Sequence, residues 1–208
     1  MGYATMDKTF VLNVADWQAQ SIVSGPGVRF VLWLQGCAIR CPGCINEDFL
    51  SFEPRRLLTV DEVYDSVCST PGIAGVTYSG GEPMHQAPAL SVLSERLRQV
   101  GYTVVCYTGY TIEQLLKRSD ENIIRLLRNT DILIDGPYVA NLSAPLLWRG
   151  SANQRVHFLT DAYREWINMV QQEVAEVEFT VGVASMSITG IYDRSLWKTL
   201  QERLKSDG

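Results

Sequence analysis

Three cysteines, Cys37, Cys41 and Cys44, follow directly on an apolar run from Val28 to Leu34. Three thiols this close together, in a chain with an odd total of five cysteines, indicate a metal site in a reducing compartment rather than a disulfide framework. A tetrahedral structural zinc ion needs four ligands, whereas this cluster offers three. A cubane iron–sulfur cluster bound by only three thiolates would leave one iron open for chemistry.

Two plainer interpretations of the cysteines stay open. One is a zinc site completed by a distant ligand, and the other is an electron-carrying cluster whose fourth ligand is Cys68 or Cys106. Both cysteines lie within apolar patterns, so we expect them to be buried as small hydrophobic side chains. His85 follows a turn and His157 alternates within a predicted strand, so neither is expected to bind metal, although His85 can form the rim of a site.

Several blocks of sequence around and after the cysteines carry a family resemblance. In chain order they are Ser24-Gly25-Pro26-Gly27-Val28-Arg29, Gln35-Gly36-Cys37, Arg40-Cys41-Pro42-Gly43-Cys44-Ile45-Asn46, Ser79-Gly80-Gly81-Glu82-Pro83, Tyr107-Thr108-Gly109-Tyr110, Asp135-Gly136-Pro137 and Trp148-Arg149-Gly150-Ser151-Ala152-Asn153-Gln154. The C-x3-C-x2-C spacing resembles the cluster motif of radical S-adenosylmethionine (SAM) enzymes. Together the blocks resemble the activating enzymes of anaerobic (class III) ribonucleotide reductases, strongly over about residues 20–155 and more weakly beyond Thr160.

The resemblance implies both a fold and a reaction. The fold would be α/β, a partial (β/α)6 barrel of the radical SAM type with an open parallel sheet and outer helices. Cys37, Cys41 and Cys44 would bind a [4Fe-4S] cluster whose open iron is chelated by SAM. Reductive cleavage of SAM would give methionine and a 5′-deoxyadenosyl radical, which would generate a glycyl radical on the large subunit of an anaerobic ribonucleotide reductase. The electron would come from a flavodoxin-type or other low-potential donor, in an anaerobic setting.

Two other functional classes stay open beside this one. A radical SAM fold and cluster do not fix the substrate, so the chain could modify a small molecule or a peptide in a biosynthetic pathway. It could also be a non-catalytic iron–sulfur carrier or a zinc-binding module.

Short apolar runs alternate with segments of helical period, which is typical of parallel strands with crossover helices. Capping patterns predict helices that begin at Thr59, Thr111 and Asp120, and another helix begins near Pro88. Further helices are expected around 166–174 and, as a closing element, over Trp197, Leu200 and Leu204. The predicted strands are 28–34, 74–79, 103–107, 131–135, 155–159 and 178–184.

The resembling blocks follow the carboxyl ends of predicted strands, where loops of parallel barrels build their sites. Glycines at positions 80 and 81 would let backbone approach SAM, and Glu82 or a nearby carbonyl could accept from its ammonium. Asp135 could bind a cation or orient substrate, and Tyr78 or Tyr107 could pack on adenine, although both tyrosines suit a core as well. The full set of expected cofactor-binding residues is Tyr78, Ser79, Gly80, Gly81, Glu82, Thr108, Asp135, Arg149 and Asn153, with Gln154 and Arg155 as further donors for SAM or a partner.

The bulk properties predict one domain over residues 1–208, with a core at about 20–160 and a C-terminal extension at about 161–208. No apolar run is long enough to span a membrane, and the first residues lack a secretory pattern, so we expect a cytoplasmic protein. The net charge of −5, without a basic run, gives no electrostatic footprint for nucleic acid.

Overall fold

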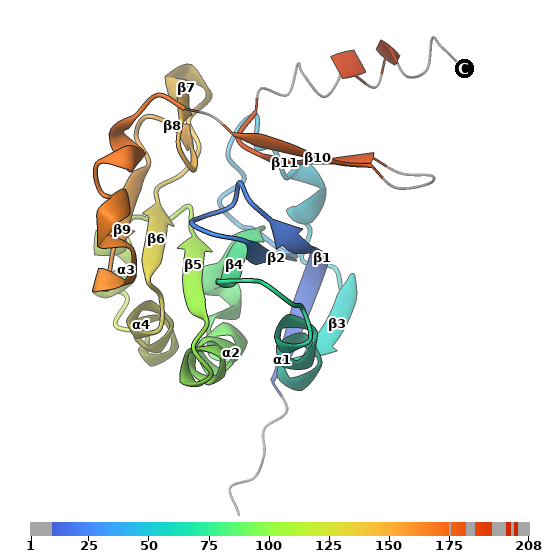
Figure 1. The fold of residues 1–208 in the computed structure, drawn as a ribbon, viewed down its shortest axis with the longest axis vertical. Helices are drawn as coiled ribbons and strands as arrows, with labels where there is room; N and C mark the ends of the chain where they lie inside the picture. Colours follow the sequence, from blue (N-terminus) through green and yellow to red (C-terminus); the bar gives the residue numbers. More distant parts are fainter. Residues whose placement is uncertain (1–9, 175, 182–185, 193–198, 201, 204–208) are drawn as a thin grey trace, which may run out of the picture.

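The computed structural model describes residues 10–174, 176–181, 186–192, 199–200 and 202–203. Its centre is a mixed sheet of seven strands in the order β3-β1-β2-β4-β5-β6-β9 (Figure 1). The strands are β1 (Val11–Ser21), β2 (Arg29–Leu34), β3 (Arg56–Thr59), β4 (Gly75–Gly80), β5 (Thr103–Tyr107), β6 (Ile132–Asp135) and β9 (Arg155–Phe158). The helices are α1 (Val60–Cys68), α2 (Ala87–Gln99), α3 (Ile112–Lys117) and α4 (Glu121–Arg128). The α/β class is confirmed.

Only the middle of this sheet is parallel. β2, β4, β5 and β6 run in one direction, whereas β1, β3 and β9 pair antiparallel with their neighbours. The open parallel sheet expected from the sequence therefore differs at both edges. β9 returns antiparallel because the chain between β6 and β9 forms the small hairpin β7 (Ser143–Leu146) and β8 (Arg149–Ser151) instead of a crossover helix.

The sequence pattern missed β1 and β3 altogether. β1 carries register shifts between Val14 and Asp16 and between Gln18 and Ser21. Such irregularities interrupt the period-two alternation that identifies a strand. β3 has only four residues, all exposed or half-buried, so it offers little hydrophobic signal.

One face of the sheet is covered by helices, and we call it the helix face. Capping boxes at Thr59 and Thr111 and an aspartate cap at Asp120 begin α1, α3 and α4 at the predicted positions. Alternate residues of the strands point to these helices, among them Leu32, Leu34, Val76, Tyr78, Val104, Cys106 and Leu133. With Leu90, Leu93 and Leu97 of α2, Leu115 of α3 and Leu126 of α4 they form the larger apolar core.

The opposite face carries a smaller apolar cluster. Val105 and Ile132 of the sheet meet Trp148 of the hairpin region and Val170, and Trp166 lies 5.1 Å from Trp148 between ring centroids. The helix expected around 166–174 is instead two short 3-10 turns, Asp161–Trp166 and Met169–Gln171. Tyr163 interrupts the first turn with a φ of −134°, and its hydroxyl lies 2.7 Å from the Thr103 hydroxyl of β5.

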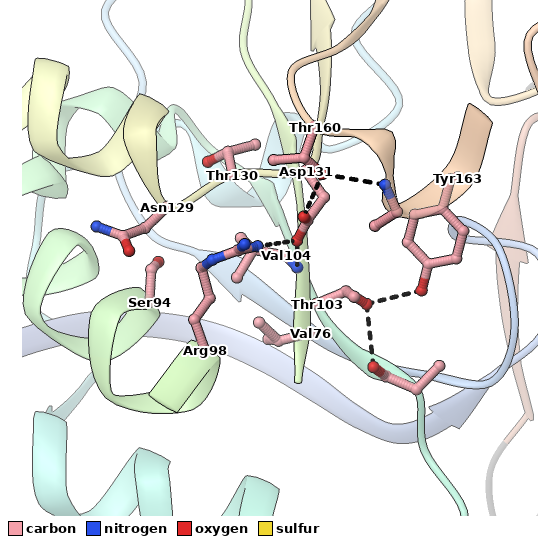
Figure 2. A network of polar contacts seen from close by, with 12 residues as sticks. Val76, Ser94, Arg98, Thr103, Val104, Asn129, Thr130, Asp131, Thr160 and Tyr163 are labelled. Atoms are coloured by element: carbon pink, nitrogen blue, oxygen red, sulfur yellow. Dashed lines mark hydrogen bonds and ion pairs between the residues drawn. The ribbon is translucent and has the colours of Figure 1, made fainter. Parts of the chain in front are cut away.

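Buried polar groups at the amino-terminal ends of the parallel strands form the network in Figure 2. Asp131 is 1% exposed and accepts hydrogen bonds from Arg98, from the Val104 N–H and from the Thr160 hydroxyl. Arg29 is fully buried beside this network and donates to Thr77 and Thr103 and to the Tyr163 hydroxyl. The extension after Thr160 is thereby tied to the sheet.

A separate hairpin, β10 (Val177–Val181) and β11 (Met186–Gly190), follows the 3-10 turns. The strand predicted over 178–184 is confirmed up to Val181, and residues 182–185 lie outside the described part of the chain. Of the predicted closing helix, Trp197 and Leu204 also lie outside the described residues. Among the described residues, no helix is long and apolar enough to cross a lipid bilayer.

Candidate metal centre

The three clustered cysteines lie in a loop that leaves the carboxyl end of β2 and returns to it. The loop is closed at its base by hydrogen bonds from Gly36 N to Phe49 O at 2.8 Å and from Cys37 N to Leu50 O at 3.1 Å. A turn from Cys44 N to Cys41 O at 3.1 Å shapes its tip. Gly43 has a φ of +77°, a conformation in which a side chain is strained, so glycine is required between the last two cysteines.

The loop extends over the ends of the neighbouring parallel strands. Asn46 Nδ2 donates to Gly80 O at the end of β4 at 3.2 Å. Ile39 packs so closely on Gly109, after β5, that a Cβ there would lie 2.5 Å from Ile39 Cδ1. The backbone N–H of Tyr138, after β6, lies near enough to the Cys41 thiol to lower its pKa. The predicted convergence of the strand ends is confirmed, and sequence reasoning had missed the anchoring roles of Ile39 and Asn46.

Burial favours the protonated form of two of the thiols. Burial raises the pKa of Cys41 and Cys44, and the neighbouring thiols raise it further, while N–H donors from Tyr138 and Asn46 act in the opposite direction. Binding of iron would require the thiolate form and would release these protons, and the same N–H groups would then stabilise the bound sulfur. Three soft sulfur donors in one glycine-shaped loop fit an iron–sulfur cluster.

No preformed closed metal cage exists in the described part of the chain, because no three His, Cys, Asp or Glu side chains are grouped closely enough to bind an ion. Cys106 is fully buried on the helix face, as expected. Cys68 is exposed at the end of α1, so the expectation that it is buried was wrong; the last turn of this amphipathic helix directs it to solvent. Neither cysteine belongs to the loop, which disfavours a fourth protein thiolate.

Glu82 is buried and its carboxylate links the end of β4 to the end of β5 through hydrogen bonds. Its carboxylate is 1% exposed and accepts from Met84 N at 2.9 Å, from the Thr108 hydroxyl at 2.8 Å and from Gly109 N at 2.8 Å. Burial raises the pKa of Glu82 to about 7, although these three donors favour the charged form. Since its oxygens are already engaged, a backbone carbonyl suits a ligand ammonium better than Glu82 does.

The two glycines before Glu82 are required by the protein's own packing. A Cβ on Gly80 would lie 2.5 Å from Leu34 N, and a Cβ on Gly81 would lie 2.4 Å from Gly36 O. Gly80 also has a φ of +95°. These positions were expected to be glycine so that a ligand could approach, and the structure gives a different reason, namely the close approach of β4 to β2 and to the cysteine loop.

The two predicted aromatic contacts fall on opposite faces of the sheet. Tyr78 is fully buried on the helix face, where its hydroxyl accepts from Ser94 at 3.1 Å, and burial strongly raises its pKa. This placement removes Tyr78 from the candidate site and assigns it to the core. Ser79 and Tyr107 face the other side, where Ser79 pairs with Trp33 and Tyr107 pairs with Ile134. Trp33 was not identified from the sequence, although it alternates with the core residues Leu32 and Leu34.

Asp135 lies on the helix face and is already matched by positive charge. It accepts from Arg155 and from Ile112 N at 2.7 Å, and His157 Nε2 lies 3.1 Å from it. Burial alone would raise the pKa of Asp135, but these contacts outweigh it and lower the pKa overall. A role in binding a cation is therefore not supported. His157 is engaged by a carboxylate, consistent with the expectation that it is not a metal ligand.

The Gly-Ser-Ala-Asn-Gln block joins the hairpin to the end of β6. Asn153 Nδ2 donates to Pro137 O at 2.7 Å and Gln154 Nε2 donates to Gly136 O at 3.0 Å. Gln154 also accepts from Gly150 N, and Arg149 donates to Val170 O. These side chains already form hydrogen bonds with the backbone of the chain. To contact SAM as expected, they would have to bind it in addition to these groups or in place of them.

Comparison with known proteins decides between the families that such a loop could belong to. Residues 23–157 match the family model described as a 4Fe-4S single cluster domain. The anaerobic ribonucleoside-triphosphate reductase-activating protein of Escherichia coli K12 is 32% identical over 157 residues, which cover 71% of this chain and 99% of that protein. The chain belongs to this family of activating proteins.

Two other family members match to a similar extent. The activating protein of Vibrio cholerae is 32% identical over 72% of this chain and 99% of its own length, and that of bacteriophage T4 is 32% identical over 67% and 89%. Among solved structures, QueE from Escherichia coli aligns over 50% of this chain and 54% of its own, with a TM-score of 0.38 and 18% identity. The family match ends at residue 157, so the C-terminal extension of this chain lies beyond the matched part.

Proposed function

We propose that the protein is a radical SAM activating enzyme that generates a glycyl radical on an anaerobic ribonucleoside-triphosphate reductase. The observation that carries the proposal is a three-thiol loop extending over the ends of β2, β4, β5 and β6, in a chain that belongs to the activating-protein family. Cys37, Cys41 and Cys44 would supply three ligands to the [4Fe-4S] cluster. The other two cysteines lie outside the loop, which leaves a coordination position for SAM.

The cofactors supply the difficult chemistry, and the chain supplies position and shielding. Held by Cys37, Cys41 and Cys44, a reduced cluster would supply the electron for cleavage of SAM into methionine and a 5′-deoxyadenosyl radical, and this radical would take the Cα hydrogen of a glycine in the partner. The backbone of Ser79, Gly80 and Gly81, braced by Glu82 and Thr108, would orient SAM beside the loop. Trp33 and Tyr107, on the face opposite the helices, would exclude water from the reacting carbon.

We further propose a barrel architecture, a role for the hairpin and a cellular location. The parallel strands β2, β4, β5 and β6 would be the wall of a partial (β/α)6 barrel, within a single domain that includes the extension. Arg149 and Asn153 would stabilise the rim of the SAM site through the hairpin instead of contacting SAM directly. Thiols of this kind need a reducing compartment, so we propose a cytoplasmic location.

Electron paramagnetic resonance with the partner tests this function. The protein is reconstituted anaerobically with iron and sulfide, reduced, and mixed with SAM and a class III reductase large subunit. A glycyl radical doublet that depends on SAM is the expected result. Cleavage of SAM without a protein radical on any reductase would instead favour a small-molecule or peptide substrate.

A further inference from the structure

The end of α3 carries two cations that form no ion pair among the described residues. The chain as a whole has a net charge of −5, and six of the described arginines form ion pairs with carboxylates. Lys117 and Arg118 are exposed and take part in none of the ion pairs among the described residues. The nearby Asp120 carboxylate is engaged by the N–H groups at the start of α4. This end of α3 therefore presents two exposed cations that no described carboxylate contacts, on a protein that is acidic overall.

These cations border a shallow cavity with an aromatic wall. The cavity has a volume of about 270 Å³ and is lined by Tyr110, Gln114, Lys117 and Arg118. The guanidinium carbon of Arg118 lies 3.9 Å from the centroid of the Tyr110 ring, which fixes the charge over an aromatic surface. Leu116, beside them, is 52% exposed. Positive charge with exposed apolar area is typical of a surface that docks a negatively charged protein.

A row of rings connects this surface to the cysteine loop. The ring centroids of Tyr110 and His85 lie 6.0 Å apart, and the Tyr110 hydroxyl is 3.0 Å from His85 Nε2. The ring centroids of His85 and Phe52 lie 5.5 Å apart. Phe52 in turn packs on Gly36, where a Cβ would lie 2.7 Å from Phe52 Cδ1, and Gly36 directly precedes Cys37. Contacts thus run without a break from α3 to the first cluster cysteine.

The row of rings lies on the helix face of the sheet, whereas the glycine-bearing partner is expected to approach the opposite face. Tyr110 packs against the helix-face core, whereas Trp33 and Tyr107 line the opposite face. A glycine-bearing partner that reaches the opposite face would leave the end of α3 accessible.

We propose that Phe52, Tyr110, Lys117 and Arg118, which we call the α3 surface, dock an acidic, low-potential one-electron carrier protein that reduces the cluster. The inference rests on the proposed function, because only a redox-active cluster needs such a partner. One electron leaves the reduced carrier and enters the oxidised cluster, so the carrier is oxidised and the cluster reduced by one electron each, with no proton or group transferred. Attraction between the carrier's carboxylates and the two cations increases the rate of encounter.

Charge reversal at the α3 surface distinguishes an effect on carrier binding from an effect on SAM cleavage. The double variant Lys117→Glu/Arg118→Glu is compared with Arg128→Glu, a matched change of an exposed arginine at the far end of α4. Binding of oxidised flavodoxin, an acidic carrier that contains flavin mononucleotide, to the reconstituted protein is measured by calorimetry. We expect the dissociation constant of the double variant to rise by about tenfold or more, and that of the control to stay within about twofold.

The same variants are then assayed for SAM cleavage with two reductants. With reduced flavodoxin at sub-saturating concentration, the rate of the double variant should fall by about tenfold, and raising the salt concentration should reduce the wild-type rate toward it. With dithionite, which needs no docking surface, both variants should match the wild type. Lys117→Glu alone, which leaves the Arg118–Tyr110 contact intact, should show a smaller loss with flavodoxin only.

Two results would overturn the docking proposal: unchanged flavodoxin binding by the double variant, or equal loss with flavodoxin and dithionite. A wild-type protein that fails to cleave SAM even with dithionite would refute the proposed function itself. The dithionite assay therefore distinguishes the two failures.

Discussion

The two ends of the parallel strands both carry polar groups that need partners, and they differ in how those groups are satisfied. At the amino ends, Asp131 accepts from Arg98 and Thr160 (Figure 2), and the buried Arg29 beside it donates to the Tyr163 hydroxyl, so both find their partners within the protein. At the carboxyl ends, three thiols share a loop without forming a closed metal cage among the described residues. The first arrangement is complete and stabilises the fold, whereas the second is completed by a cofactor.

The largest expected effect comes from removing single thiols at the carboxyl end. Cys37→Ala, Cys41→Ala and Cys44→Ala should each lose the visible absorbance of the reconstituted cluster and reduce methionine release from SAM to background, since two thiolates cannot retain the cluster. Cys68→Ala and Cys106→Ala are the matched controls and should keep wild-type iron content. Cleavage retained in any loop variant would contradict the ligand assignment.

At the amino ends of the strands, the corresponding change removes the buried carboxylate of Asp131. Asp131→Ala leaves the Arg98 guanidinium, the Val104 N–H and the Thr160 hydroxyl without their acceptor. Removing one partner of a buried ion pair costs about 3–5 kcal/mol of unfolding free energy. The loss is measured by denaturant unfolding of the apoprotein, while iron bound per folded chain should not change. Asp61→Ala, which breaks an exposed pair with Arg96, should cost about 1 kcal/mol at most. Equal losses from the two variants would contradict a special role for the buried network.

Glu82 is the group at the carboxyl end whose effect depends on pH. Because burial raises its pKa from 4.5 to about 7, the folded chain binds more protons than the unfolded chain between these pH values. Its contribution to stability is therefore greatest at low pH and declines as pH rises through that window, by about 3 kcal/mol in total. The stability of the wild type relative to Glu82→Gln, measured by denaturant unfolding from pH 4.5 to pH 8, should fall accordingly. A difference independent of pH would show that folding does not raise the pKa of Glu82.

The smallest effect should come from the link between the extension and the sheet. Tyr163→Phe removes a hydroxyl that contacts Thr103 at 2.7 Å and Arg29 at 3.2 Å. Loss of these hydrogen bonds should cost about 1 kcal/mol of unfolding free energy, read as a lower denaturant midpoint, with no change in cluster content. A loss of bound iron in this variant would show that the two ends of the sheet are coupled.

The contrast between the two ends also explains what the sequence could predict. The cysteine loop, the strands β2, β4, β5 and β6 and the capped helices follow from local patterns, so residues such as Thr59 and Asp120 marked their boundaries correctly. Contacts between distant segments left no local signal. The exposed position of Cys68, the burial of Tyr78 on the helix face and the pairing of Asp135 with Arg155 all depend on which face a side chain occupies.

The 3-10 turns after Thr160 show the same limit in the backbone. Trp166 and Val170 have helical spacing, but Tyr163 leaves helical geometry to reach Thr103, sixty residues earlier in the chain. The glycines at 80 and 81 were correctly singled out as special positions. Their reason, the close approach of Leu34 and Gly36, became evident only from the packed strands.

The central claim is that the loop supplies three ligands and SAM supplies the rest, and electron–nuclear double resonance tests it most directly. The reconstituted, reduced protein is mixed with SAM that carries ¹⁵N in its amine and ¹⁷O in its carboxylate. The account predicts hyperfine coupling of both labels to the cluster spin, which places the two groups on iron. A reduced cluster that shows neither coupling, or a chain that binds a single divalent ion in place of a cluster, would contradict it.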